Sequence, residues 1–167
     1  LTLNDLASVY ASTGRTLLAQ PMQEQVVAIY EKRYGPESLE LALSLNNLAE
    51  NCRAIGLFDR AEPNYQRALA IREKRFGPEH PRVAAVLSNQ SMFERDRGDF
   101  LRSETLALRA LAMREKTLGP EHPEVAQSLT NLGEIYRVRG DIDRSEQFTL
   151  RAIAIKEKTL GPNHPSL

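Results

Sequence analysis

Three histidines recur in the motifs GPEHP and GPNHP, and imidazole is the side chain most often used to bind metals or transfer protons near neutral pH. They are His80, His122 and His164, spaced 42 residues apart. A metal site needs several imidazoles within a few ångström, whereas equivalent loops of stacked helical units lie at least about 8–10 Å apart. Each histidine also precedes a proline, which disfavours helical backbone and suits the first turn of a following helix. The motif therefore predicts the end of one helix and the start of the next, and no metal site.

The remaining candidates for chemistry favour structural roles. Cys52, the only cysteine, cannot form an internal disulfide, and it occupies the repeat position that Tyr10 and Tyr136 fill elsewhere, which predicts a buried thiol. Asp141 and Asp143 straddle a predicted helix start, where aspartate caps free amides. The sequence has no glycine-rich phosphate loop, H-E-x-x-H, G-x-S-x-G or paired-cysteine motif. We therefore expect no enzymatic activity and no cofactor.

The overall composition excludes two classes of partner. The 22 basic and 22 acidic residues leave a formal net charge of zero, whereas a nucleic-acid binder normally carries a basic surplus. No apolar run approaches the roughly 18 residues that a membrane-spanning helix requires. We expect a cytoplasmic, intracellular protein and a fragment of a longer polypeptide.

A 42-residue repeat organises the chain. The glycine-proline pairs at 35, 77, 119 and 161 keep this spacing, and so do the phrases RALAIREK at 67–74, RALAMREK at 109–116 and RAIAIKEK at 151–158. Repeats of this length indicate stacked supersecondary units. We predict one continuous domain made of a degenerate repeat 1–34, three repeats at 35–76, 77–118 and 119–160, and the start of a further repeat at 161–167.

Each unit predicts two helices. Between 38 and 54, apolar or small residues fall three and four apart, as on one face of a helix: Leu41, Leu45, Leu48, Ala49 and Cys52. Gly56 supplies the left-handed backbone that ends this helix. A second periodic set follows between 58 and 75, and Gly77 and Pro78 end it.

The repeat resembles the tetratricopeptide repeat of the kinesin light chain type. Four residues match that family's first-helix pattern W-x2-L-G-x2-Y, with leucine in place of tryptophan: Leu129, Leu132, Gly133 and Tyr136. Ser145 and Ala152 fall where the second helix carries small residues, and the 42-residue period is that of the kinesin light chain type. The resemblance implies an all-α fold, a right-handed superhelical solenoid of antiparallel helix pairs.

Two departures from the repeat pattern carry their own expectations. The unit from 77 places Gln90, Ser91 and Glu94 at core-facing positions, and a buried acid is costly unless it is paired, so we expect a looser or rearranged seam there. In the first unit Gln23 stands where the next unit has Tyr65, as expected for a worn or partly exposed end of an array.

The resemblance also implies that the first helix of each unit lines an inner surface. The helix face about 100° from the core stripe then points into a groove. That face carries Asn46, Glu50 and Arg53; Ser88, Met92 and Arg95; Thr130, Glu134 and Arg137; the recurring Asn47, Asn89 and Asn131; and the weaker set Asn4, Ser8 and Ala11.

The arginines on this face have two interpretations. Arg53, Arg95 and Arg137 recur in register, and a ladder of guanidinium groups favours an extended acidic peptide. Alternatively, Glu50 or Glu134, three residues before an arginine, neutralises it within the unit. The resemblance implies a ligand that combines an aromatic anchor with acidic neighbours.

The other residues on this face also allow two interpretations. The asparagines at 46, 47, 89 and 131 either contact a peptide backbone or brace a neighbouring helix, and Met92 is either filler or an adaptable contact. Chaperone-type repeats hold a C-terminal carboxylate with a lysine and an asparagine. Here Asn46 and Glu50 occupy those places, which disfavours that ligand.

We therefore expect a protein–protein interaction scaffold that holds an extended, acidic segment of a partner protein. The alternative is a regulatory or sensor array of a larger effector, such as an NTPase or protease, that docks on its own chain. Uncapped repeats could also associate end to end.

Overall fold

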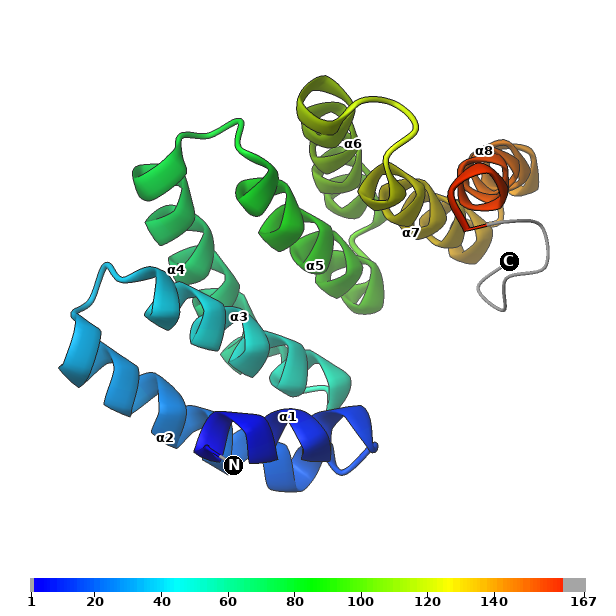
Figure 1. The fold of residues 1–167 in the computed structure, drawn as a ribbon. Helices are drawn as coiled ribbons and strands as arrows, with labels where there is room; N and C mark the ends of the chain where they lie inside the picture. Colours follow the sequence, from blue (N-terminus) through cyan, green and yellow to red (C-terminus); the bar gives the residue numbers. More distant parts are fainter. Residues whose placement is uncertain (1, 161–167) are drawn as a thin grey trace. The chain divides into compact units, whose positions relative to one another are not determined.

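Every regular element of the computed structural model, which describes residues 2–160, is an α-helix (Figure 1). The helices are α1 (Leu3–Ser12), α2 (Thr16–Tyr34), α3 (Leu39–Ala54), α4 (Phe58–Phe76), α5 (Pro81–Arg97), α6 (Phe100–Leu118), α7 (Pro123–Arg139) and α8 (Ile142–Leu160). The predicted all-α class is confirmed. None of these helices is both long and apolar enough to cross a membrane.

The chain forms two compact units. The first, residues 1–78, contains α1 to α4, and the second, which begins at Glu79, contains α5 to α8. Within each unit, consecutive helices pack on one another. One helix pair falls inside each of the four ranges expected for the repeats. That these pairs build one continuous right-handed solenoid stays a prediction.

The histidine motifs mark helix starts, as the sequence predicts. The Nδ1 atom of His80 accepts a hydrogen bond from the backbone N–H of Arg82 at 3.1 Å, and that of His122 accepts one from Glu124 at 3.2 Å. Each histidine is the N-cap of its helix, and the proline after it is the first helical residue. His164 lies outside the described residues.

The short turns inside the second unit combine a glycine and an aspartate. Gly98 and Gly140 end α5 and α7 with φ values of 86° and 87°, a left-handed backbone that glycine adopts without strain. Asp99 and Asp141 follow, and each side chain accepts a hydrogen bond from the backbone N–H three residues later, at 3.0 and 3.2 Å. Asp141 is therefore a helix cap, as expected.

The core of the first unit lies between α2, α3 and α4. Tyr65 and the apolar stripe predicted for α3 are buried there. Cys52 belongs to this stripe, is 1% exposed, and has a pKa raised by burial. It is thus the buried thiol that the sequence predicts. Gln23 is also buried, at 1% exposure, and its amide group lies 3.5 Å from the Ser44 carbonyl oxygen.

The core of the second unit includes a cluster contributed by α6, α7 and α8. Its members are Ala107, Leu111, Val125, Ala126, Leu129, Leu132, Ile135, Tyr136, Ala152 and Ile155. The ring of Tyr136 stacks on that of Phe148, with centroids 5.4 Å apart. All but the alanines are large side chains, and their burial contributes to the packing of α7 on α8.

Small residues let the helices of a pair cross closely. A Cβ atom at Gly133 on α7 would lie 2.7 Å from Oγ1 of Thr149 on α8, and the Ser145 hydroxyl donates to the Gly133 carbonyl at 2.8 Å. Ser103 donates in the same way to the carbonyl of Ser91 at 2.7 Å. The serine position that the sequence assigns to the crossing thus also satisfies a first-helix carbonyl.

The polar side chains expected at the seam of the third repeat are buried. Gln90, Ser91 and Glu94 are 3%, 0% and 1% exposed. Arg102 on α6 and Arg97 on α5 form ion pairs with the Glu94 carboxylate. The seam therefore holds a buried charge that is paired with arginines.

Lysine–glutamate pairs that sequence reasoning missed tie each interrepeat loop to the second helix of the same repeat. They are Lys74–Glu37, Lys116–Glu79 and Lys158–Glu121, each with Nζ 2.5 Å from a carboxylate oxygen. All six side chains are at least 60% exposed, so solvent screens these pairs and each adds little to stability.

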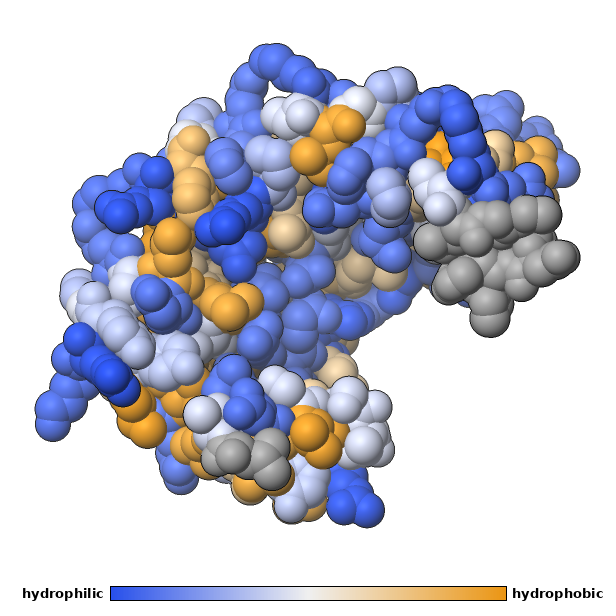
Figure 2. Space-filling view, in the orientation of Figure 1, coloured by the Kyte–Doolittle hydropathy of each residue, from blue (hydrophilic) through white to orange (hydrophobic). Residues whose placement is uncertain are grey.

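Some apolar side chains are exposed at the surface. Figure 2 shows apolar residues interspersed with polar residues over α1 and α2.

Candidate functional site

The residues predicted to line a groove lie on the first helix of three helix pairs. Helix α3 carries Asn46, Asn47, Glu50 and Arg53; α5 carries Ser88, Asn89, Met92 and Arg95; and α7 carries Thr130, Asn131, Glu134 and Arg137. Within the second unit, α5 and α7 contact each other directly. Within the first unit, residues of α1 and α3 line a common cavity. Each unit therefore presents its own pair of first helices.

Arg53 is held by a neighbouring acid in the first unit. Its Nη2 atom lies 3.0 Å from Oε2 of Glu50, three residues earlier. The other carboxylate oxygen of Glu50 accepts a hydrogen bond from the hydroxyl of Tyr65. Burial raises the pKa of Tyr65, and the Glu50 charge raises it further, so this hydroxyl stays a donor. Glu50 thus links Arg53 on α3 to Tyr65 in the core of its unit.

Glu134 joins two arginines in the second unit. Arg137 holds it with two hydrogen bonds, at 2.8 and 2.6 Å, and Nη1 of Arg95 on the neighbouring helix lies 3.8 Å away. The hydrogen bond from Arg137 is the main cause of a lowered pKa at Glu134, and the charge of Arg95 contributes. Arg95 also makes hydrogen bonds to Asp96 at 2.9 and 2.6 Å. Intramolecular neutralisation, one of the two interpretations, is therefore present at all three arginines.

The other predicted residues differ in how far they face solvent. Asn46 and Ser88 are buried, at 8% and 6% exposure, and the Ser88 hydroxyl accepts a hydrogen bond from Arg114 at 2.9 Å. Asn131 accepts one from the Gln127 side chain at 3.0 Å. Of the recurring residues, Asn47, Asn89 and Met92 are half-buried, whereas Thr130 is exposed.

A buried arginine that the sequence interpretation missed supports this face from behind. Arg114 on α6 is 6% exposed and donates from one nitrogen to Ser88 on α5 and to Ser128 on α7, at 2.9 and 2.6 Å. Its Nε atom lies 3.3 Å from the Glu124 carboxylate. Burial lowers the pKa of Arg114, and Glu124 opposes that shift. The available signal was the recurrence of a base at this repeat position, as Arg72 and Lys156.

A cavity of about 260 Å³ opens between the first helices of the first unit. Four short residues of α1 form one wall: Ala7, Ser8, Ala11 and Ser12. Asn47, Glu50 and Asn51 of α3 form the other wall, and Gln23 of α2 adds to the lining. Sequence reasoning found Asn47 and Glu50 and the weaker set on α1, but it missed Asn51 and the role of Gln23.

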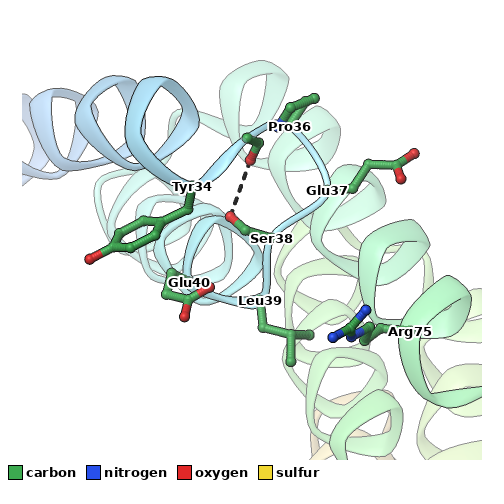
Figure 3. A pocket seen from close by; sticks show the side chains of 8 residues that line it. Tyr34, Pro36, Glu37, Ser38, Leu39, Glu40 and Arg75 are labelled. Atoms are coloured by element: carbon green, nitrogen blue, oxygen red, sulfur yellow. Dashed lines mark hydrogen bonds between the residues drawn. The ribbon is translucent and has the colours of Figure 1, made fainter.

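A second hollow, of about 540 Å³, lies where the α2–α3 loop meets the end of α4 (Figure 3). The loop lines it together with the side chains of Tyr34, Glu37, Glu40 and Arg75. The hydroxyl group of Ser38 donates a hydrogen bond to the Gly35 carbonyl oxygen at 3.1 Å within this loop. The charged side chains here are exposed, and Glu37 is paired with Lys74. The hollow has no buried polar group without a partner, so we do not assign it as the site.

No group of three or more metal-binding side chains occurs among residues 2–160. Residues 1–74 and 82–158 match the family model of the tetratricopeptide repeat. The chain belongs to the tetratricopeptide repeat family. Members of this family are typically non-enzymatic scaffolds for protein–protein interaction.

Solved structures place this tetratricopeptide repeat chain near kinesin light chain-like proteins. BtubC (BKLC) from P. vanneervenii is 30% identical with a TM-score of 0.80, and the match covers 98% of this chain and 65% of that one. A protein from Podosopora anserina, named as a kinesin light chain with nearly identical TPR-like repeats, is 29% identical with a TM-score of 0.79, covering 98% and 78%. The predicted kinesin light chain-like repeat type is confirmed. A comparison with curated proteins gave no match.

Proposed function

We propose that this repeat chain binds an extended, acidic segment of a partner protein along the first-helix faces of its units. The observation that carries the proposal is the position of Glu134 between Arg95 and Arg137, at 3.8 and 2.6 Å. A carboxylate at this place is reached by guanidinium groups from two adjacent first helices. Glu134 therefore occupies the position of a partner carboxylate and indicates the chemistry that this face accepts.

The intramolecular acids do not block such a ligand. A guanidinium group has five N–H donors, and a bidentate carboxylate uses two of them. Arg137 uses its Nε and Nη2 atoms for Glu134, and its side chain remains 61% exposed. A second carboxylate can therefore bind to Arg137 while the first stays in place. The asparagines on the same face provide donors and acceptors for the backbone of an extended peptide.

The test compares two triple variants that lose the same charge. Arg53→Ala, Arg95→Ala and Arg137→Ala together remove the proposed contacts. Arg60→Ala, Arg67→Ala and Arg151→Ala together remove arginines that also form ion pairs, but on second helices. Binding of short fluorescent peptides rich in aspartate and glutamate, with one aromatic residue, is measured by fluorescence anisotropy.

We expect the first triple variant to bind at least about tenfold more weakly than the parent chain, and the second to bind within about twofold. Circular dichroism checks that both keep their helices. Equal affinity of the parent and the first variant, or an equal loss in both variants, contradicts the proposed site. Glu134→Gln adds a test of opposite sign, because removal of the competing internal carboxylate should tighten the binding of acidic peptides.

A further inference from the structure

The cavity of the first unit is lined on one side by short side chains of α1. At the positions one repeat apart, Ser8 is followed by Glu50, Met92 and Glu134, and Ala11 is followed by Arg53, Arg95 and Arg137. In the second unit these positions carry longer side chains, and Nη1 of Arg95 lies 3.8 Å from Oε1 of Glu134 on the neighbouring first helix. In the first unit, Ser8 and Ala11 leave the space between α1 and α3 open.

Several polar groups that line the cavity have no partner in the chain. Asn51 is 7% exposed, yet its side chain makes no hydrogen bond to any of residues 2–160. The side chain of Asn47 also makes none within that range, and Oε1 of the buried Gln23 accepts none. These carboxamide groups line the cavity, so an occupant with hydrogen-bonding groups can bond with them.

The lining offers carboxamide donors and acceptors, serine oxygens and the carboxylate of Glu50, which also pairs with Arg53. The hydroxyl groups of Ser8 and Ser12 donate to carbonyl oxygens of their own helix, at 2.9 and 3.1 Å, which leaves their oxygens as acceptors. Glu50 gives one oxygen to Arg53 and the other to Tyr65, and a carboxylate has about four lone-pair sites. No lysine, arginine or histidine is among the residues that line the cavity.

We propose that this cavity binds the ammonium group of a lysine side chain in the partner segment. An ammonium ion has three donors and no acceptor, which complements the carboxylate of Glu50 and the oxygens of Asn47, Asn51 and Gln23. A cavity of about 260 Å³ has room for one such side chain with its methylene stem. The proposal rests on the proposed function, because it names one residue of the segment that the face binds.

The test uses small probes rather than the unidentified partner. Nα-acetyl-lysine methylamide, the norleucine analogue that lacks the ammonium group, and the glutamate analogue are each titrated into the ¹⁵N-labelled chain. The readout is the side-chain NH₂ signals of Asn47, Asn51 and Gln23. We expect the lysine probe to shift these signals with a Kd of about 1–10 mM, and the norleucine probe to bind at least about tenfold more weakly.

Two variants locate the binding. Ala11→Arg introduces the residue that the next three repeats carry at this position, so the helix should tolerate it while its side chain fills the cavity. Ala112→Arg adds the same charge at an exposed position of α6 in the other unit. The lysine-induced shifts should disappear in the first variant and persist in the second.

The outcomes separate the two proposals. Equal binding of the lysine and norleucine probes, tighter binding of the glutamate probe, or shifts that survive Ala11→Arg overturn the lysine assignment. None of these results depends on Arg95 or Arg137, so the acidic-segment proposal can stand when the lysine assignment fails. If acidic peptides bind regardless of the arginines while the lysine probe behaves as expected, only the proposed function fails.

Discussion

The Nε atom of Arg102 on α6 lies 3.0 Å from Oε1 of Glu94 on α5, and the Glu94 side chain is 1% exposed. The Arg102 side chain is 45% exposed, so one partner is buried and the other reaches solvent. Arg97 adds a weaker contact, at 3.9 Å, to the second oxygen of Glu94. The same repeat position holds Cys52 in the preceding repeat, so a charge has been placed where an uncharged residue also packs.

The two halves of this ion pair should differ in their effect on stability. Arg102→Ala removes a cation 3.0 Å from a buried carboxylate, and we expect the free energy of unfolding to fall by about 2–4 kcal/mol. Glu94→Leu removes the buried charge and lets Arg102 return to water, which should cost less than about 1 kcal/mol. Urea unfolding followed by circular dichroism measures both. Equal losses for the two variants would show that burial does not determine the cost.

The sequence predicts the repeat architecture well because local signals repeat with it. The histidine–proline motif and the αL glycines Gly98 and Gly140 define helix ends through backbone rules that act within a few residues. The 42-residue period then gives the pairing of helices. The environment of Glu94 is harder to predict. Its repeat position predicts a buried acid, but its ion-pair partner, Arg102, lies on another helix.

Contacts between helices account for what the sequence does not reveal at the site. Each of the three groove arginines is predicted as a position, but the sharing of Glu134 by Arg95 and Arg137 depends on how α5 and α7 pack. The cavity in the first unit is lined by the short side chains of Ser8 and Ala11. The sequence shows that these side chains are short, but it does not show that a cavity remains beside them. From the sequence alone, Arg114 would be assigned to the surface. In the structure it is buried and donates to serines of α5 and α7.

Arg114 and Ser128 should show strong energetic coupling. Ser128→Val removes one of the two serine acceptors of Arg114 Nη1, which leaves one buried N–H group unpaired, and should cost about 1–3 kcal/mol. In an Arg114→Met background the same change leaves no such donor, so its cost should fall below about 1 kcal/mol. A double-mutant cycle of urea unfolding measures the coupling. A Ser128→Val cost that is the same in both backgrounds contradicts the hydrogen bond as its source.

Gly133 is expected to depend on its contact with Thr149. Gly133→Ala brings a methyl group to 2.7 Å from the Thr149 hydroxyl, and we expect a loss of about 1–2 kcal/mol despite the higher helix propensity of alanine. Thr149→Ala removes the clashing oxygen. In that background Gly133→Ala should become neutral or stabilise the helix by up to about 1 kcal/mol. Thermal unfolding of the four proteins measures this, and a persistent loss would assign the constraint to the backbone of α8.

Cys52 should react only when its unit opens. The thiol is 1% exposed and its pKa is raised, so both access and thiolate fraction are low in the folded chain. We expect its reaction with a disulfide reagent at mildly alkaline pH to be at least about 100-fold slower than in urea-unfolded protein. Absorbance of the released thiolate follows the reaction. Comparable rates in the folded and unfolded protein contradict a buried thiol.

Glu134 should make stability depend on pH in a defined direction. Its pKa in the folded chain is lowered from the model-compound value of 4.5, chiefly by the hydrogen bond from Arg137, so the folded chain binds its proton less readily than the unfolded chain. The stabilisation is therefore present above about pH 4.5 and is lost as the pH falls through the lowered pKa. Arg137→Ala should raise the pKa of Glu134 and weaken this dependence. Arg139→Ala should leave it unchanged, because Arg139 pairs with Glu104. Carboxyl ¹³C shifts of Glu134 report its titration directly, and a value at or above 4.5 in the parent chain contradicts the ion pair.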